Sequence, residues 1–177
     1  MSAITVSFTL NGRATTLTVS PATTLLTALR EHAQLTATKA GCSQGGCGSC
    51  TVLVNGEPTL ACLTPLAHVE GQEVTTLEGI TPVGGLHPLQ KAFYDRFAAQ
   101  CGYCTPGMIM AAADLLARNP DPSEEEIRHA LDGNLCRCTG YHNIVRAVRR
   151  AAERQKEGAV IVGEPPKPEA AERGGKG

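Results

Sequence analysis

The sequence predicts an α+β protein with a strand-rich first half and a helical second half. From residue 4 apolar and polar residues alternate, which is the period of a half-buried strand, and two Asn-Gly pairs stand where hairpin turns would fall. From about residue 89 the apolar residues instead recur every three or four positions, which is the period of an amphipathic helix.

The elements of the first half predict a β-grasp arrangement. Asn11-Gly12 closes a first hairpin and Asn55-Gly56 a second, because both turn positions tolerate positive φ. A short helix is expected over residues 23–32, and residues 41–50 read as a glycine-rich loop. Two hairpins, a crossing helix and this loop make up the predicted fold. The expected strands cover residues 4–10, 17–19, 51–54, 59–63 and 74–77.

Residues 78–85, with three glycines and one proline, read as a linker between the halves. Four helices forming a small bundle are expected beyond it. They are predicted at residues 89–99, from the N-cap Thr105 to just before Asn119, from the capping box at Ser123 to Leu131, and at 143–155. The resulting division is a first domain over residues 1–79, a helical domain over 86–156 and a disordered tail over 157–177, where proline, glycine and charge dominate.

Composition excludes several classes of function. The formal net charge is −1 and the pI is about 6.5, so no basic surface for nucleic acid is predicted. No run of 18 apolar residues exists, so no transmembrane helix is expected. The N-terminus has no charged stretch followed by an apolar one and no twin-arginine pattern, so we expect a cytoplasmic protein.

Eight cysteines fall into two sets of four. The first set has the C-x4-C-x2-C…C spacing of plant-type 2Fe–2S proteins, and four thiolates are what one such cluster requires. The second set combines C-x2-C with C-x-C, a pair that is unusual for zinc. The sequence therefore predicts two 2Fe–2S clusters. The sets are Cys42, Cys47, Cys50 and Cys62, and Cys101, Cys104, Cys136 and Cys138.

The alternatives for these cysteines are weaker. Structural zinc favours paired C-x2-4-C knuckles, which neither set has in full. Disulfides are rare in a reducing compartment. A Rieske centre needs two histidine ligands, and the five histidines show no such pairing, although His142 lies close to the second set.

The residues between the cysteines suit a cluster-binding loop. Glycine accepts positive φ and permits close approach, so the loop can aim several N–H groups at the sulfurs; the candidates are Gly41, Gly45, Gly46 and Gly48. Arg137 lies between two of the cysteines, where its charge either raises the reduction potential or simply compensates charge at the surface.

Three motifs resemble a known family. GCSQGGCGSCTV, QCGYCTPGM and GNLCRCTGY are similar, in this order, to the signatures of the small iron–sulfur subunit of molybdenum hydroxylases, the xanthine oxidase family, which includes aerobic carbon monoxide dehydrogenase. The resemblance covers residues 4–155. It implies a plant-ferredoxin-like β-grasp domain with the distal cluster, held by the first cysteine set, and a four-helix bundle with the proximal cluster, held by the second.

The resemblance also implies partners and cofactors. A large subunit would carry a molybdopterin cofactor, a medium subunit would usually carry FAD, and the assembly would be a heterotrimer, with dimerisation of that trimer an open alternative. Electrons would pass from molybdenum through the proximal and distal clusters to FAD. Gln100 and Cys138 would lie beside the pterin, and Ser49 stands where many members have alanine.

On this interpretation the chain is an electron-transfer subunit of an oxidoreductase and has no catalytic residue of its own, because the substrate chemistry would take place on a partner. Two alternatives remain. The chain could be a free-standing two-cluster ferredoxin, although the long helical half argues against this, or a zinc-bound interaction module.

Overall fold

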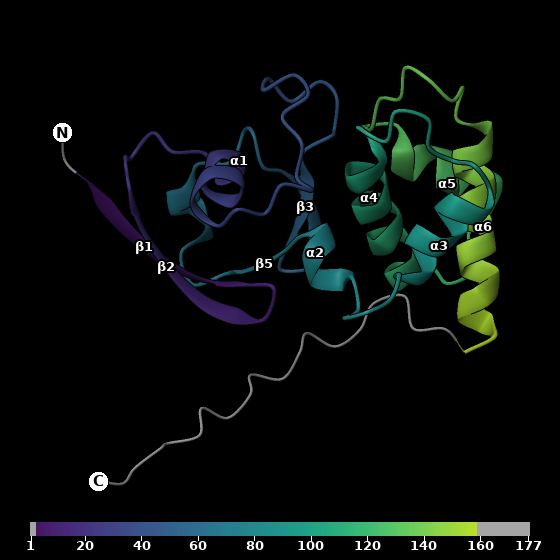
Figure 1. Ribbon diagram of the computed structural model, residues 1–177, viewed down its shortest axis with the longest axis horizontal. Coiled ribbons are helices and arrows are strands. Elements are labelled where there is room, and N and C mark those ends of the chain that lie inside the picture. The colour runs from purple at the N-terminus through teal and green to yellow at the C-terminus, as the bar shows by residue number, and fades with distance from the viewer. Residues whose placement is uncertain (1–2, 159–177) are drawn as a thin grey trace, which may run out of the picture.

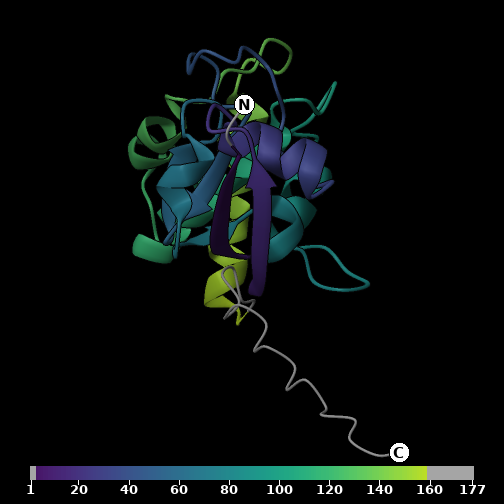
Figure 2. The ribbon, with the colours of Figure 1, turned by 90° about the vertical axis from the view of Figure 1, so that its left-hand side faces the viewer.

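The computed structural model describes residues 3–158, which form a sheet-bearing half and a helical half placed one after the other along the long axis (Figure 1). Figure 2 looks along this axis from the N-terminal side and shows the first hairpin in front of the last helix. Each half has its own cluster of buried hydrophobic residues, one between Val6 and Val74 and the other between Leu89 and Ala152.

Five strands form one mixed sheet in the order β2-β1-β5-β3-β4. The strands β1 and β5 are parallel, and every other neighbouring pair is antiparallel. This sheet confirms the predicted α+β class. The strands are β1 (Ile4–Leu10), β2 (Arg13–Val19), β3 (Thr51–Val54), β4 (Glu57–Leu60) and β5 (Glu73–Thr75).

Both predicted hairpin turns are present. Asn11 and Gly12 have φ values of 51° and 76°, and Asn55 and Gly56 have 51° and 85°, so all four residues occupy the left-handed region that a two-residue primed turn requires. The first turn pairs Leu10 with Arg13. Strand β1 therefore keeps its alternation, and its inward residues are buried.

The crossing helix is shorter than expected and changes type. Helix α1 (Leu25–Thr27) begins at Thr24, whose hydroxyl accepts a hydrogen bond from the Thr27 amide at 3.2 Å. The chain continues as a π-helical segment, η1 (Ala28–His32). A 3-10 turn, η2 (Leu66–Val69), follows the second hairpin. The fully buried Leu25, Leu29 and Leu66 join these segments to the core of the sheet.

The helical half contains five helices among the described residues. The capping box predicted at Ser123 is present, and a second one joins His87 to Gln90. Helix α4 is buried along most of its length because it packs on α5 and on β3. The helices are α2 (Leu77–Ile80), α3 (Pro88–Asp95), α4 (Thr105–Arg118), α5 (Glu124–Leu131) and α6 (His142–Lys156).

The observed boundaries correct several expectations. The last strand was expected over residues 74–77 but ends at Thr75. The helical turn α2 (Leu77–Ile80) occupies the start of the segment that was expected to be a linker. The helix expected over 89–99 ends at Asp95, because Phe97 adopts a left-handed conformation. The N-cap of α4 is Cys104, one residue before the predicted Thr105. The predicted tail lies outside the described residues from position 159 onward.

Within residues 3–158 no helix combines the length and the hydropathy that a membrane crossing would need.

Candidate iron–sulfur site

The first cysteine set converges at one end of the sheet. Three of its members lie in the loop that leads into β3, and Cys62 follows β4. The four thiols form two pairs, because Cys42 lies within hydrogen-bonding reach of Cys47, and Cys50 within reach of Cys62. The second pair is buried, whereas the first is only partly covered. The structure therefore groups the four cysteines of this set into an inner and an outer pair.

The loop directs backbone N–H groups at the outer pair. The amide of Gln44 bonds the Cys42 sulfur, and together with the Cys47 thiol and the amides of Gly46 and Cys47 it lowers the pKa of Cys42 to about 7. Burial has the opposite effect on Cys50 of the inner pair and raises its pKa to about 11. A loop that stabilises a thiolate in this way suits an anionic cluster.

Two of the four candidate glycines adopt a positive φ, a backbone conformation that glycine accepts without strain. Gly45 and Gly48 have φ values of 82° and 67°, where a side chain would strain the backbone. A Cβ on Gly48 would also lie 2.2 Å from the carbonyl oxygen of Gly133. Gly46 has no positive φ, and a Cβ there would meet nothing within 4 Å. Of the four candidates, Gly46 therefore needs glycine neither for its backbone conformation nor for a close approach to a neighbour.

The second set is held by two turns of the helical half. Cys101 and Cys104 lie just before α4, and Cys136 and Cys138 lie in the loop between α5 and α6. These thiols also form two pairs: the Cys101 and Cys138 sulfurs are 3.5 Å apart and exposed, and Cys104 lies within hydrogen-bonding reach of Cys136. Burial raises the pKa of Cys104 to about 12. Both cages thus have an inner and an outer pair.

Two residues that the sequence did not single out support the second turn. The hydroxyl of Thr139 lies 3.1 Å from the Cys136 sulfur and accepts a hydrogen bond from the Tyr141 amide at 3.2 Å. The Tyr141 hydroxyl accepts a bond from the Cys136 amide at 2.8 Å. The motif C-T-G-Y was visible in the sequence, but the left-handed φ of 68° at Tyr141 and the contact of its hydroxyl with the Cys136 amide were not.

The donor sets fit two-iron clusters. In a 2Fe–2S cluster each of the two irons takes two protein ligands, so four thiols grouped as two pairs match its requirement. The geometry therefore fits a cluster with two thiolates on each iron better than it fits one tetrahedral ion.

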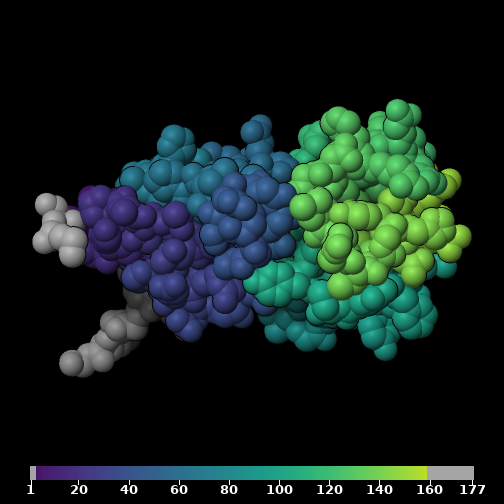
Figure 3. Space-filling model, turned by 90° about the horizontal axis from the view of Figure 1, so that it is seen from above, coloured from purple at the N-terminus to yellow at the C-terminus, as the bar shows by residue number. Residues whose placement is uncertain are grey.

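The two cages are joined directly. The Leu135 amide donates to the carbonyl oxygen of Cys47 at 2.9 Å, which links a residue next to Cys136 to a member of the first set. The side chain of Asn134 donates to the Gly48 carbonyl at 2.9 Å and to the Thr51 hydroxyl at 3.3 Å. Figure 3 views this end of the molecule and shows the blue surface of the first loop against the green surface of the second half.

Two further contacts tighten this joint. The Tyr103 hydroxyl donates to the carbonyl oxygen of Ala40 at 2.9 Å. A Cβ on Gly107, in the first turn of α4, would lie 2.3 Å from the carbonyl oxygen of Gly48. Helix α4 therefore approaches the first loop closely because residue 107 has no side chain.

Replacing Asn134 by alanine is expected to destabilise the chain by roughly 1–3 kcal/mol, because the Gly48 carbonyl and the Thr51 hydroxyl lose their donor in a site where Asn134 is only 5% exposed. Thermal unfolding of the cluster-loaded chain measures this as a midpoint lower by a few degrees. Gln44→Ala is the control, because this exposed amide lies in the first loop, four residues before Gly48, and makes no side-chain hydrogen bond among the described residues. Equal midpoints for the two variants would contradict the role of Asn134.

The other singled-out residues lie around the second set. Gln100 and Arg137 are exposed, and neither side chain has a hydrogen bond or ion pair within residues 3–158. His142 is the first residue of α6 and is exposed. In the first loop, the Ser49 hydroxyl lies 3.5 Å from the Cys47 sulfur. A serine here can donate a hydrogen bond to a ligand thiolate, which alanine cannot do.

Comparison with known proteins places these features in context. A model described as a 2Fe-2S iron-sulfur cluster binding domain matches residues 8–76, and one described as a [2Fe-2S] binding domain matches residues 76–149. The chain is 49% identical to the nicotinate dehydrogenase small FeS subunit of Eubacterium barkeri over 154 residues, which cover 87% of this chain and 98% of that protein.

Two solved structures are similar as well. Quinoline 2-oxidoreductase from Pseudomonas putida 86 has a chain that matches with a TM-score of 0.86 and 44% identity, covering 90% of this chain and all of that one. Aldehyde oxidoreductase from Desulfovibrio gigas matches with a TM-score of 0.83 and 42% identity. The match covers 88% of this chain but only 17% of that one, so the same unit occurs there as part of a longer polypeptide.

Proposed function

Because this chain belongs to the small iron–sulfur subunits of the molybdenum hydroxylases, the xanthine oxidase family, we propose a specific role for each of its eight cysteines. Its function is electron transfer within an oxidoreductase complex whose catalysis is on partner subunits. We assign the distal cluster to the set that begins at Cys42 and the proximal cluster to the set that begins at Cys101. The grouping of each set into two pairs of thiols supports both assignments.

The exposure of the cages supports the order of transfer. When bound, the clusters supply one-electron carriers between the molybdopterin and the FAD of other subunits. Cys101 and Cys138 are exposed, so the proximal cage opens toward the surface where a molybdopterin-bearing partner would dock. The hydrogen bond from Leu135 to Cys47 joins this cage to the distal one. This joint is the observation on which the proposed two-step route chiefly depends.

We also infer finer features of the assembly. Gln100 and Cys138 are assigned to the contact with the pterin, since both are exposed and Gln100 directly precedes Cys101, whose sulfur lies 3.5 Å from that of Cys138. A heterotrimer with a large molybdopterin-binding subunit and a medium FAD-binding subunit fits a chain that matches a protein named as a small FeS subunit over 98% of that protein's length. The separate hydrophobic cores support two domains close to the expected residues 1–79 and 86–156, with α2 at the boundary, because Leu77 and Ile80 pack against the helical core. Eight free thiols fit a reducing, cytoplasmic location.

The proposal is tested by iron analysis and by EPR spectroscopy of the purified chain. About four irons per chain and two distinguishable signals after reduction are expected, because each set of four cysteines holds one two-iron cluster. About two irons per chain would contradict the two-cluster assignment, and a colourless zinc protein would contradict iron altogether. A protein that carries both clusters but never associates with a molybdenum-containing chain would instead be a free-standing ferredoxin.

A further inference from the structure

A surface cavity of about 570 Å³ lies between the C-terminal end of α3 and the first three turns of α6. The chain passes from this end of α3 into Cys101, and α6 begins four residues after Cys138. The cavity therefore adjoins the helix ends that hold the exposed pair of proximal thiols. None of its lining residues belongs to either cysteine set.

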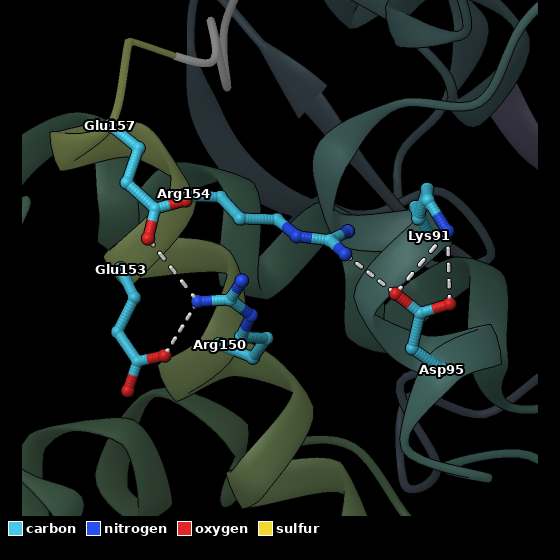
Figure 4. Close-up of polar contacts among 6 residues, drawn as sticks. All are labelled: Lys91, Asp95, Arg150, Glu153, Arg154 and Glu157. Carbon is cyan, nitrogen blue, oxygen red and sulfur yellow. Dashed lines mark hydrogen bonds and ion pairs between the residues drawn. The ribbon is translucent and has the colours of Figure 1, made fainter.

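Four arginines line this cavity, and three of them form no ion pair among residues 3–158, although Arg149 also attracts Glu124 of α5 electrostatically. Arg150 pairs with Glu153 at 3.0 Å and with Glu157 at 3.5 Å (Figure 4). The nearby Asp95 is already paired twice, with Lys91 at 3.0 Å and with Arg154 at 2.7 Å (Figure 4). The remaining three arginines are exposed and have no ion pair within residues 3–158; they are Arg96, Arg146 and Arg149.

This concentration of positive charge is local. The whole chain has a formal net charge of −1, so the three arginines do not simply reflect a basic protein. Arginine is also the cation that interfaces favour, because its planar group binds carboxylates with two parallel hydrogen bonds. A surface with three unpaired arginines around a cavity is therefore complementary to carboxylates from outside the chain.

An exposed aromatic residue stands in the same cavity. Phe97 has a φ of 52° and is 81% exposed. It ends α3 in a Schellman arrangement, in which its own amide donates to Tyr94 at 3.1 Å and the Ala98 amide donates to Phe93 at 2.9 Å. Glycine is the usual residue at this position, and a phenylalanine there is strained. No buried contact with residues 3–158 compensates for this strain, because Phe97 lies largely in solvent.

We propose that the surface formed by Arg96, Phe97, Arg146 and Arg149 binds an acidic segment of the large molybdopterin-binding subunit. Carboxylates of this segment pair with the arginines, and an apolar side chain of the partner covers Phe97. Aromatic residues and arginine are the types that dominate binding energy at protein interfaces. Phe97 precedes the exposed Cys101 by four residues and Arg146 follows the exposed Cys138 by eight, so a partner docked here is held close to the segments that carry the proximal cage. This inference rests on the proposed function.

Charge reversal tests the electrostatic half of the inference. The large subunit is tagged and co-expressed with the wild-type chain, with the double variant Arg96→Glu/Arg146→Glu, or with the control Arg13→Glu, which reverses an exposed arginine of β2 in the other half. The retained small chain is then measured against NaCl concentration. The double variant is expected to bind at least about tenfold more weakly, since like charges would face each other. Arg13→Glu should behave as the wild type.

The outcomes separate this inference from the proposed function. If the wild-type chain is not retained by the large subunit, both the proposed function and the inference fail. If it is retained and the double variant dissociates at the same salt concentration as the wild type, the inference fails alone. If the double variant instead disrupts association between copies of this chain and leaves the complex intact, the surface is a self-interface and the inference is wrong.

Phe97→Gly tests the apolar part of the inference, and its two expected effects have opposite signs. The isolated cluster-loaded chain should unfold about 2–4 °C higher, because glycine relieves the strained conformation. The complex should nevertheless dissociate about tenfold more readily, because the aromatic contact is lost. Val83→Gly, at a fully exposed residue of the loop between α2 and α3, is the control for removal of an apolar side chain. A variant that stabilises the chain without weakening the complex would overturn the role of Phe97.

Discussion

Gly48→Ala is expected to lower the free energy of unfolding of the cluster-loaded chain by about 3 kcal/mol or more, and to reduce occupancy of the distal cluster. The φ of 67° at this position costs an alanine about 1–3 kcal/mol. The added Cβ would also lie 2.2 Å from the Gly133 carbonyl oxygen, a backbone atom that cannot move aside without displacing the second loop. Thermal unfolding should show a midpoint lower by about 6 °C or more.

Gly46→Ala is the matched control, because it lies in the same loop, two residues away. A Cβ there meets nothing within 4 Å, and the backbone has no positive φ. This variant should keep its full complement of iron and its unfolding midpoint. Gly107→Ala tests the joint from the other side, since its Cβ would lie 2.3 Å from the Gly48 carbonyl oxygen. Normal stability of both Gly48→Ala and Gly107→Ala would show that the two halves do not meet as described.

The contrast between Gly46 and Gly48 shows what the sequence can and cannot predict. A glycine-rich loop between cysteines predicts that some residues need left-handed φ, but each glycine carries the same local signal. Which one is essential depends on a carbonyl group 85 residues further along the chain. The same holds for Asn134 and Tyr103, whose partners lie in the other half. Contacts between segments that are far apart in the sequence cannot be predicted from the spacing of neighbouring residues.

Local signals were far more informative. The Asn-Gly turns and the alternation in β1 predicted both hairpins, because turn conformation and strand period are properties of a few adjacent residues. The same reasoning placed the cage-forming cysteines in two sets. It could not show that each set divides into an inner and an outer pair, since burial is decided by the packing of the surrounding helices and strands. The sequence did not predict that α3 ends at Asp95, because phenylalanine, unlike glycine, is not a residue that usually marks the end of a helix.

Cys138→Ala is expected to remove the proximal cluster and abolish turnover of the complex, while the distal cluster survives. The iron content should fall from about four to about two per chain, because only one set of four thiols remains complete. Cys138 is exposed and belongs to the outer pair, so its loss leaves the joint between Leu135 and Cys47 in place. EPR of the reduced variant should therefore keep one of its two signals.

Cys104→Ala should have a broader effect than Cys138→Ala, although both remove one ligand of the same set. Cys104 is buried and is the N-cap of α4, the helix whose residue Gly107 meets the distal loop. Loss of the proximal cluster by this route should displace the first turn of α4 and lower the occupancy of the distal cluster as well. Metal binding can supply much of the folding free energy of each half. Comparing the two variants therefore shows whether loss of the proximal cluster also destabilises the half that holds the distal cluster. Equal loss of both signals in both variants would show that the halves fold as one unit, and retention of the distal signal in both would show that they fold independently.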